Sequence, residues 1–274
     1  MVGIIRKIIS IFIISLLVFA ICSASTSDIT VSGSSTVMPL AEAAAEEFNL
    51  LQKDYVVTVS AGGTGAGILG IVERKNDIAM ASREITDEER NKSNDTFEEF
   101  LIGLDGISLA VSDEIYLAGV KDLNRQQVRD IYSGNITNWK EVGGPDAEIY
   151  VIAREEGSGT RDNFNEIVLG DRDAETPGVD TVAMGAAEVK TAIAGSDKAI
   201  GYLGFNYLGG GVAEIAFNGI TPTYENIKLD LYELHRHLYF YTIGEPSKGA
   251  KAFIDFVQGP EGQKIAAEEG FIPI

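Results

Sequence analysis

Apolar positions recur with two periods along the chain, because short β-like runs are followed by stretches with helical spacing. The run "ITVSG" (29–33) predicts a strand, and "TVMPLAEAAAEEF" after it predicts a helix with acidic residues on its outer face. The segments "YVVTVS", "AGILGIVERK" and "NDIAMAS" continue as strand, helix and strand, and "REITDEERNKS" follows as a polar helix or loop. This βαβαβ order predicts an α/β fold with mainly parallel sheets.

A second α/β set follows, with the helix "NRQQVRDIYSG", the strand "EIYVIA", a helix that opens at Ser158, the helix "GAAEVKTAIAG" and the strand "AIGYLG". Two apolar strands, "LDGISLAVS" and "HLYFYTIG", flank this set, and two helices close the chain. We therefore predict two lobes, residues 28–111 with 236–274 and residues 112–235. We expect strands near 109–111 and 238–241 to join the lobes, a crossing that permits hinge closure on a ligand.

The N-terminus predicts a secretory signal over residues 1–24, since Arg6 and Lys7 precede an apolar run at 8–21 and small polar residues follow. The run is shorter than the roughly 20 residues that span a bilayer, although an uncleaved anchor stays open. Cys22, the only cysteine, is either a lipid-modified residue or part of a discarded signal. We expect a periplasmic or cell-surface protein that folds without a disulfide.

The chain is strongly acidic, with a formal charge of −19 that becomes −21 when Arg6 and Lys7 are removed with the signal. Such a charge disfavours binding to nucleic acid or to an anionic membrane. If the ligand is an anion, its capture must depend on local donors rather than on the overall field.

Three predicted helix starts share small and hydroxyl residues at the carboxyl ends of strands. A helix start offers unpaired backbone N–H groups, glycine lets a ligand approach the backbone, and Ser or Thr adds a hydroxyl donor. For any one of them, an ordinary helix cap is the alternative. The three loops contain Ser34, Ser35 and Thr36; Gly62, Gly63, Thr64 and Gly65; and Gly157, Ser158, Gly159 and Thr160.

Arginines lie beside these loops and could bind an oxyanion through two parallel hydrogen bonds. Arg83 follows Ser82 at the end of a predicted strand, and Arg154 ends an apolar strand, with Arg161 one turn into the next helix. The alternative for each arginine is an ion pair with a neighbouring carboxylate, Glu84, Glu155 or Asp162.

Gly65, Gly67 and Gly70 spell the G-x-G-x-x-G of dinucleotide-binding loops, but the turn before them is long and no acidic strand end follows about twenty residues later. We attribute these glycines to packing. The sequence has no G-x-S-x-G, Walker or H-E-x-x-H motif, so we expect no enzymatic activity, no cofactor and no metal site.

The ordered motifs "GSSTVMPL", "GGTGAGI", "MASRE", "GNITNWKEVGG", "REEGSGTRDNF", "AIGYLG" and "FIDFVQGPEGQ" resemble those of the phosphate-binding proteins of phosphate ABC transporters. The resemblance runs from about residue 29 to the C-terminus. It implies a two-lobed type II periplasmic-binding-protein fold, inorganic phosphate as ligand and a membrane permease as partner.

Carried over by position, the resemblance assigns phosphate contacts to hydroxyls, backbone N–H groups and one arginine. Where some family members have an Asp that accepts the proton of hydrogen phosphate, this chain has Arg83, so Glu84, Glu155 or a hydroxyl would have to serve. The expected ligand-binding residues are Ser35, Thr36, Val37, Thr64, Ser82, Arg83, Arg154, Ser158, Gly159 and Thr160.

We therefore expect a monomeric extracytoplasmic receptor that captures phosphate between two lobes and passes it to a permease. One alternative keeps the fold and binds sulfate, molybdate or tungstate. A phosphate-ester hydrolase and a surface sensor or adhesion protein are further alternatives, although no nucleophile or metal pair for hydrolysis is evident.

Overall fold

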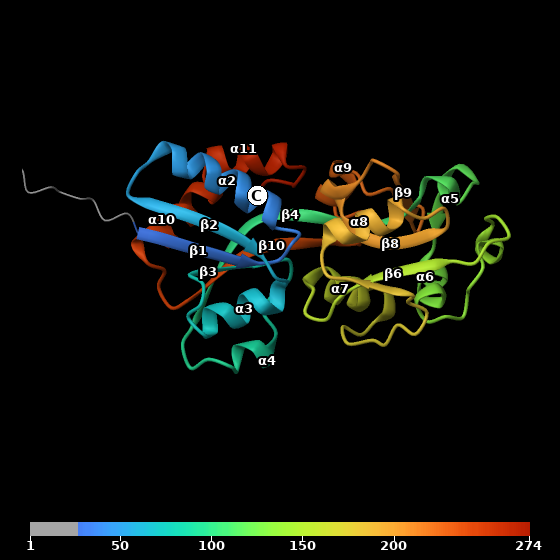
Figure 1. Ribbon diagram of the computed structural model, residues 1–274, viewed down its shortest axis with the longest axis horizontal. Helices are drawn as coiled ribbons and strands as arrows, with labels where there is room; N and C mark the ends of the chain where they lie inside the picture. The colour runs from blue at the N-terminus through green and yellow to red at the C-terminus, as the bar shows by residue number, and fades with distance from the viewer. Residues whose placement is uncertain (1–26) are drawn as a thin grey trace, which may run out of the picture.

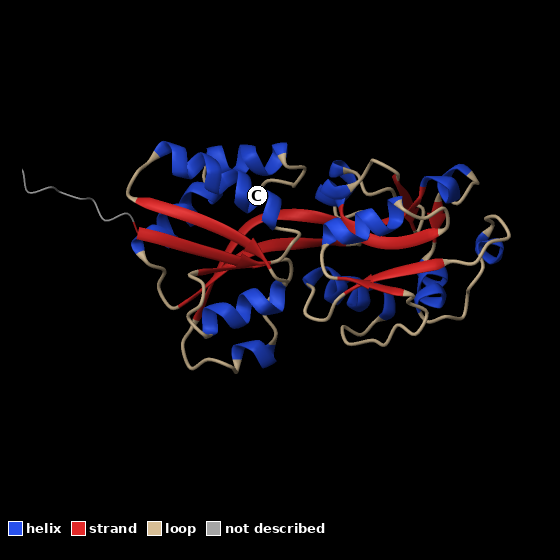
Figure 2. Ribbon diagram, in the orientation of Figure 1, coloured by secondary structure: helices blue, strands red, loops and turns tan. Residues whose placement is uncertain are grey.

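The computed structural model describes residues 27–274, so the predicted signal segment and Cys22 lie outside the described residues. Two lobes lie side by side along the long axis of the molecule, each with a sheet between layers of helices (Figures 1 and 2). This arrangement confirms the predicted two-lobed α/β fold. Within residues 27–274, no helix has the length and apolar character needed to cross a bilayer.

The first lobe contains three strands from the start of the chain and parts of two later ones. Strand β1 (Ser27–Gly33) pairs in parallel with β2 (Tyr55–Ala61) and β3 (Ile78–Ala81), as predicted. Strand β10 (His235–Ile243) then pairs antiparallel with β3 on one side and with β4 (Phe97–Ser112) on the other.

Helices cover both faces of the first-lobe sheet, because successive side chains of each strand point to opposite faces. On one face, Ile78 and Met80 pack in a core with residues of α2 (Met38–Leu51), α10 (Lys248–Gln258) and α11 (Pro260–Glu268). On the other face, Ala79 and Ala81 pack with residues of α3 (Thr64–Val72). The short helix α4 (Asp87–Arg90) lies beside α3, below it in the view of Figure 1.

The glycines of the G-x-G-x-x-G pattern lie in α3, where they allow close packing. A Cβ on Gly67 would lie 2.6 Å from the carbonyl oxygen of Ser32, and one on Gly70 would overlap the side chain of Asn76. Gly67 therefore lets α3 lie directly against β1, which is the packing role expected for these glycines.

The second lobe is built around the carboxyl half of β4, which pairs antiparallel with β8 (Ala199–Gly204) and β9 (Val212–Phe217). Strand β6 (Tyr150–Arg154) pairs in parallel with β8 and with β7 (Thr181–Ala183), and β5 (Asp122–Leu123) pairs in parallel with β9. The helices of this lobe are α5 (Asp113–Leu117), α6 (Arg125–Tyr132), α7 (Gly159–Phe164), α8 (Ala186–Ala194) and α9 (Tyr224–Lys228).

The lobes are connected through β4 and β10, which run from one lobe toward the other in Figure 1. Leu109 of β4 is buried in the core of the second lobe, whereas Leu238 of β10 is buried in the core of the first. The predicted stretch 109–111 thus lies in the second lobe and the stretch 238–241 in the first. The two strands cross between the lobes near Asp105 and Arg236.

Candidate functional site

The loop between β1 and α2 brings two hydroxyls to the junction of the lobes. Gly33 has φ 139°, and a Cβ there would lie 2.3 Å from the carbonyl oxygen of Met80, so only glycine fits. The backbone N–H of Ser34 donates to that same carbonyl at 2.9 Å. This turn positions Thr36, which is buried, and Val37, which precedes the first residue of α2.

The loop between β6 and α7 faces it from the second lobe. Ser158 caps α7, because its hydroxyl accepts a hydrogen bond from the backbone N–H of Arg161 at 3.4 Å. Thr160, two residues further, has its Oγ1 3.1 Å from Oγ1 of Thr36, although 124 residues separate them in sequence. The first and third hydroxyl loops of the sequence therefore meet across the closed cleft.

The loop at the start of α3 adds further hydroxyls to this pair. We call the hydroxyls of Thr36, Thr160, Thr64 and Ser82 the hydroxyl cluster. The backbone N–H of Ser82 donates to Oγ1 of Thr64 at 3.3 Å, and both residues are buried. The backbone N–H of Gly65 donates to the carbonyl of Gly157 at 3.0 Å, a hydrogen bond between the lobes. A Cβ on Gly159 would lie 2.5 Å from Oγ of Ser82, so this glycine lets the second lobe approach the first-lobe hydroxyls.

Arg154 lies at the end of β6 with only 2% of its surface exposed. Its Nε and Nη2 each donate to the carboxylate of Glu155 at 2.8 Å, and Nη2 also donates to Oγ of Ser35 at 3.1 Å. Its Nη1 is buried and has no hydrogen-bond partner among residues 27–274. An unpaired buried donor costs about 1–3 kcal/mol, more when charged, so this nitrogen favours an acceptor such as an anionic oxygen.

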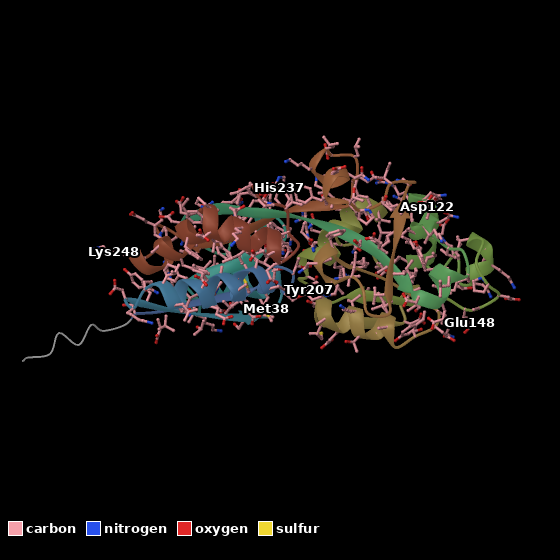
Figure 3. All side chains as sticks on the ribbon, turned by 90° about the horizontal axis from the view of Figure 1, so that it is seen from above. Met38, Asp122, Glu148, Tyr207, His237 and Lys248 are labelled. Atoms are coloured by element: carbon pink, nitrogen blue, oxygen red, sulfur yellow. The ribbon has the colours of Figure 1, made fainter. Side chains whose placement is uncertain are left out.

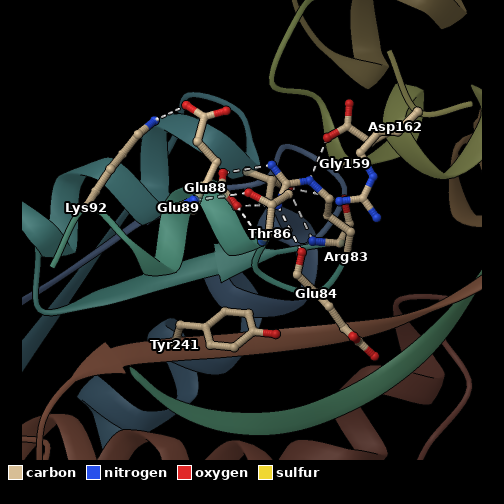
Figure 4. A network of polar contacts seen from close by, with 12 residues as sticks. Arg83, Glu84, Thr86, Glu88, Glu89, Lys92, Gly159, Asp162 and Tyr241 are labelled. Carbon is tan, nitrogen blue, oxygen red and sulfur yellow. Dashed lines mark hydrogen bonds and ion pairs between the residues drawn. The ribbon is translucent and has the colours of Figure 1, made fainter. Parts of the chain in front are cut away.

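The guanidinium of Arg83 is directed to carboxylates from both lobes. It donates to both oxygens of Glu89, at 2.7 and 2.9 Å, and its Nε donates to Asp162 in α7 at 2.6 Å (Figure 4). It also donates to the carbonyl oxygen of Glu84, whose side chain is exposed. The structure therefore brings Arg83 next to Gly159 through its aliphatic carbons, while its N–H groups bind Glu89 and Asp162.

The pKa values of the two carboxylates that contact Arg83 are shifted in opposite directions. Burial alone would raise the pKa of Glu89, but two hydrogen bonds and the charge of Arg83, with Thr86, hold that pKa below its ordinary value. Burial raises the pKa of Asp162 by more than Arg83 lowers it. Glu89 is the better satisfied of the two, because it receives both guanidinium bonds and the backbone N–H of Thr86.

Arg236 is a residue of this region that our sequence analysis missed. It lies in β10, it is buried, and its Nη2 donates to Oδ2 of Asp105 at 2.7 Å and to Oγ1 of Thr36 at 3.2 Å. The available signal was its place in the strand: Leu234, Arg236 and Leu238 alternate on the buried face, where an arginine is unusual.

Two further residues surround Ser35, whose side chain is half-buried. The hydroxyl of Tyr207 donates to the carbonyl oxygen of Ser35 at 2.9 Å, and the backbone N–H of Ala186, at the start of α8, lies 3.4 Å from Oγ of Ser35. Figure 3 places Tyr207 at the junction of the lobes. Ser35 thus receives contacts from three second-lobe residues, Arg154, Ala186 and Tyr207.

The described part of the chain contains no group of three or more His, Cys, Asp or Glu side chains arranged to hold a metal ion. The titratable groups near the hydroxyl cluster are instead paired arginines and carboxylates.

Comparison with known proteins gives the family. The model of the PBP superfamily domain matches residues 22–261. The chain is 32% identical to the phosphate-binding protein PstS of Bacillus subtilis over 252 residues, which cover 91% of this chain and 82% of that protein. It is 28% identical to PstS of Borreliella burgdorferi over 283 residues, which cover 98% and 99% of the two chains.

Solved structures agree with these relatives. A phosphate ABC transporter substrate-binding protein from Clostridium perfringens, with bound phosphate, has a TM-score of 0.84 and 37% identity, and the match covers 90% of this chain and 100% of that one. An ABC-type phosphate transport receptor from Vibrio cholerae has a TM-score of 0.74 and 31% identity over 90% and 100% of the two chains. The chain therefore belongs to the PBP superfamily, and within it to the family of the phosphate-binding proteins PstS.

Proposed function

We propose that this protein is an extracytoplasmic receptor that encloses inorganic phosphate between its two lobes and delivers it to the permease of an ABC transporter. The observation that carries the proposal is the meeting of Thr36 and Thr160 between the lobes, next to Ser35, which receives Nη2 of Arg154. Nη1 of the same guanidinium is buried and has no hydrogen-bond partner among residues 27–274. Hydroxyl and guanidinium donors from both lobes can replace the hydration shell of a tetrahedral anion. We infer the identity of the ligand from the relatives named above, because they are phosphate-binding proteins and one of the solved structures contains phosphate.

The donor set accounts for anion binding by an acidic chain. Arg154 is paired with Glu155 and Arg236 with Asp105, so the charges of the arginines are already compensated. Attraction must then come from aligned N–H and O–H dipoles, which act strongly once closure excludes water. We assign the phosphate contacts to Ser35, Thr36, Val37, Thr64, Ser82, Arg154, Ser158, Gly159 and Thr160.

We assign Arg83 a different part in binding from the direct contact predicted from sequence. A contact between Arg83 and phosphate would require the guanidinium to release Glu89 or Asp162, both of which it binds at 2.9 Å or less. We propose instead that Arg83 holds the lobes closed around the ligand.

Of Glu84 and Glu155, the two carboxylates considered from the sequence, Glu155 is the better placed to accept the proton of hydrogen phosphate. Its Oε1 faces the glycine loop of the first lobe, since a Cβ built on Gly63 would lie 3.6 Å from it. Glu84, the other carboxylate considered, is exposed. An acceptor in this position favours a protonated oxyanion over sulfate, which has no proton to donate.

We further propose that the protein is a monomer without catalytic activity.

The test of the function is calorimetric titration of the mature chain, freed of bound ligand by unfolding and refolding, with phosphate and with sulfate at equal ionic strength. We expect one-to-one phosphate binding and at least about a hundredfold weaker sulfate binding, since an unpaired buried acceptor costs a few kcal/mol. Equal affinity for sulfate would move the proposal to the alternative oxyanions, and no binding of either would overturn it.

A further inference from the structure

The buried pair of Arg236 and Asp105 lies directly behind the hydroxyl cluster. The side chains are 1% and 0% exposed, and two hydrogen bonds from Nε and Nη2 of Arg236, at 3.1 and 2.7 Å, reach Oδ2 of Asp105. Nη2 also donates to Oγ1 of Thr36 at 3.2 Å. Nη1 of Arg236 is buried and unpartnered among residues 27–274, so Asp105 does not use all of its donors.

A guanidinium has only donors, and this fixes the direction of the hydrogen bonds at Thr36. Because Oγ1 of Thr36 must accept from Arg236, its single proton is left to be donated elsewhere. Thr160, at 3.1 Å, is within reach of that proton, and an oxyanion bound between the lobes would be another acceptor for it. Without Arg236, the Thr36 hydroxyl could equally turn its lone pairs toward an anion, which would repel it.

We propose that Arg236 is a positioning residue of the anion site, which makes the Thr36 hydroxyl an obligatory donor to the bound oxyanion. The inference deepens the phosphate-binding proposal and rests on it. The hydrogen bond from Arg236 polarises the hydroxyl, so the Thr36 bond to the anion is stronger than that of a hydroxyl without such a donor. Asp105 holds the guanidinium in place from the β4 side.

The energetic cost of the pair supports a functional role. A buried ion pair is often no more stabilising than apolar residues of the same volume, because both charges lose their hydration. Here Oδ1 of Asp105 and Nη1 of Arg236 are both buried without partners among the described residues. Packing alone gives no reason for two charges at this position, whereas a fixed donor at Thr36 does.

The experiment is a double-mutant cycle read by the phosphate dissociation constant from calorimetry. One arm replaces the pair with apolar residues, Asp105→Leu with Arg236→Met, which leaves no unpaired buried charge. The other arm changes Thr36→Val, which removes the hydroxyl, with Thr36→Ser as a matched control that keeps it. Melting temperatures of the ligand-free proteins identify variants that are not folded.

We expect the apolar pair to weaken phosphate binding about tenfold in the Thr36 and Thr36→Ser backgrounds, as for one charge-assisted hydrogen bond. In the Thr36→Val background it should change affinity by less than about twofold, because the two arms remove the same interaction. The same tenfold loss in all backgrounds, or no loss in the Thr36 background, overturns the inference.

A second variant covers the case in which the apolar pair does not fold. Arg236→Lys keeps the charge beside Asp105, but one ammonium cannot reproduce the fork that binds Asp105 and Thr36 together. It should give the same loss of affinity and the same dependence on the Thr36 hydroxyl. Absence of phosphate binding by the unmutated protein would instead reject the proposed function, so the two failures are distinguishable.

Discussion

Arg83 and Asp162 form an ion pair across the cleft, with Nε 2.6 Å from Oδ2, although one follows β3 in the first lobe and the other lies in α7 of the second. Both side chains are largely buried, at 5% and 12% exposure. Glu89 holds the other edge of the guanidinium, so Arg83 joins a carboxylate of the first lobe to one of the second. The pair therefore joins the two lobes directly, and we propose that it stabilises their closed arrangement around the ligand.

Removal of this contact should weaken ligand binding without changing the donors around the ligand. We expect Asp162→Asn to weaken phosphate binding about tenfold, the value of one charge-assisted hydrogen bond. Calorimetric titration measures the loss. Glu166→Gln is the matched control, because Glu166 pairs with Arg172 on the surface, where such pairs contribute little. Equal affinities of Asp162→Asn and the unmutated protein would remove the pair from the closure mechanism.

Arg154 provides the most direct test of the anion site. We expect Arg154→Ala to weaken phosphate binding by at least about tenfold, because the change removes the unpaired Nη1 and the partner of Ser35. The melting temperature of the ligand-free protein should also fall, because the change leaves the largely buried carboxylate of Glu155 without its guanidinium partner. Arg161→Ala, in the first turn of α7, serves as the control and should bind normally. Unchanged affinity in Arg154→Ala would exclude Arg154 from the site.

Gly159 should control how closely the lobes approach. A Cβ there would lie 2.5 Å from Oγ of Ser82 and 2.7 Å from Oγ1 of Thr64, so Gly159→Ala obstructs the closed form but not the separate lobes. We expect more than about a tenfold loss of phosphate affinity, as for overpacking costs of 1–3 kcal/mol. Gly62→Ala, whose Cβ would meet only Ala66 at 3.8 Å, is the control. Small-angle scattering with phosphate would show whether Gly159→Ala stays open, and full closure would contradict this account.

The pKa of Glu89 predicts one pH dependence of stability. Because this pKa is lower in the folded protein than in the unfolded chain, the carboxylate stabilises the fold fully above the unfolded value of about 4.5. That contribution is lost as the pH falls through the lower folded value. The melting temperature of Glu89→Gln should therefore lie below that of the unmutated protein at pH 7, and the difference should shrink below about pH 4.5. A difference that is constant with pH would show that ionisation of Glu89 does not stabilise the protein.

The sequence by itself determined the local elements and the loops that carry hydroxyls. The alternation of strand and helix, the strand end at Gly33 and the capping residue Ser158 depend on neighbours within a few positions, and the structure has them as predicted. The predicted strand "LDGISLAVS" was too short, because β4 already begins at Phe97. Charged residues near the start of β4 interrupt the apolar pattern from which the strand was predicted.

The tertiary structure decided which residues meet. Thr36 and Arg236 are 200 positions apart, and Arg83 and Asp162 are 79 apart, so no local pattern relates them. Arg83 has acidic residues at Glu84, Glu88 and Glu89, and sequence does not show which of them it binds. The choice depends on long-range packing: a buried guanidinium must find acceptors wherever the folded chain brings carboxylates within hydrogen-bond distance, and here these are Glu89 and Asp162.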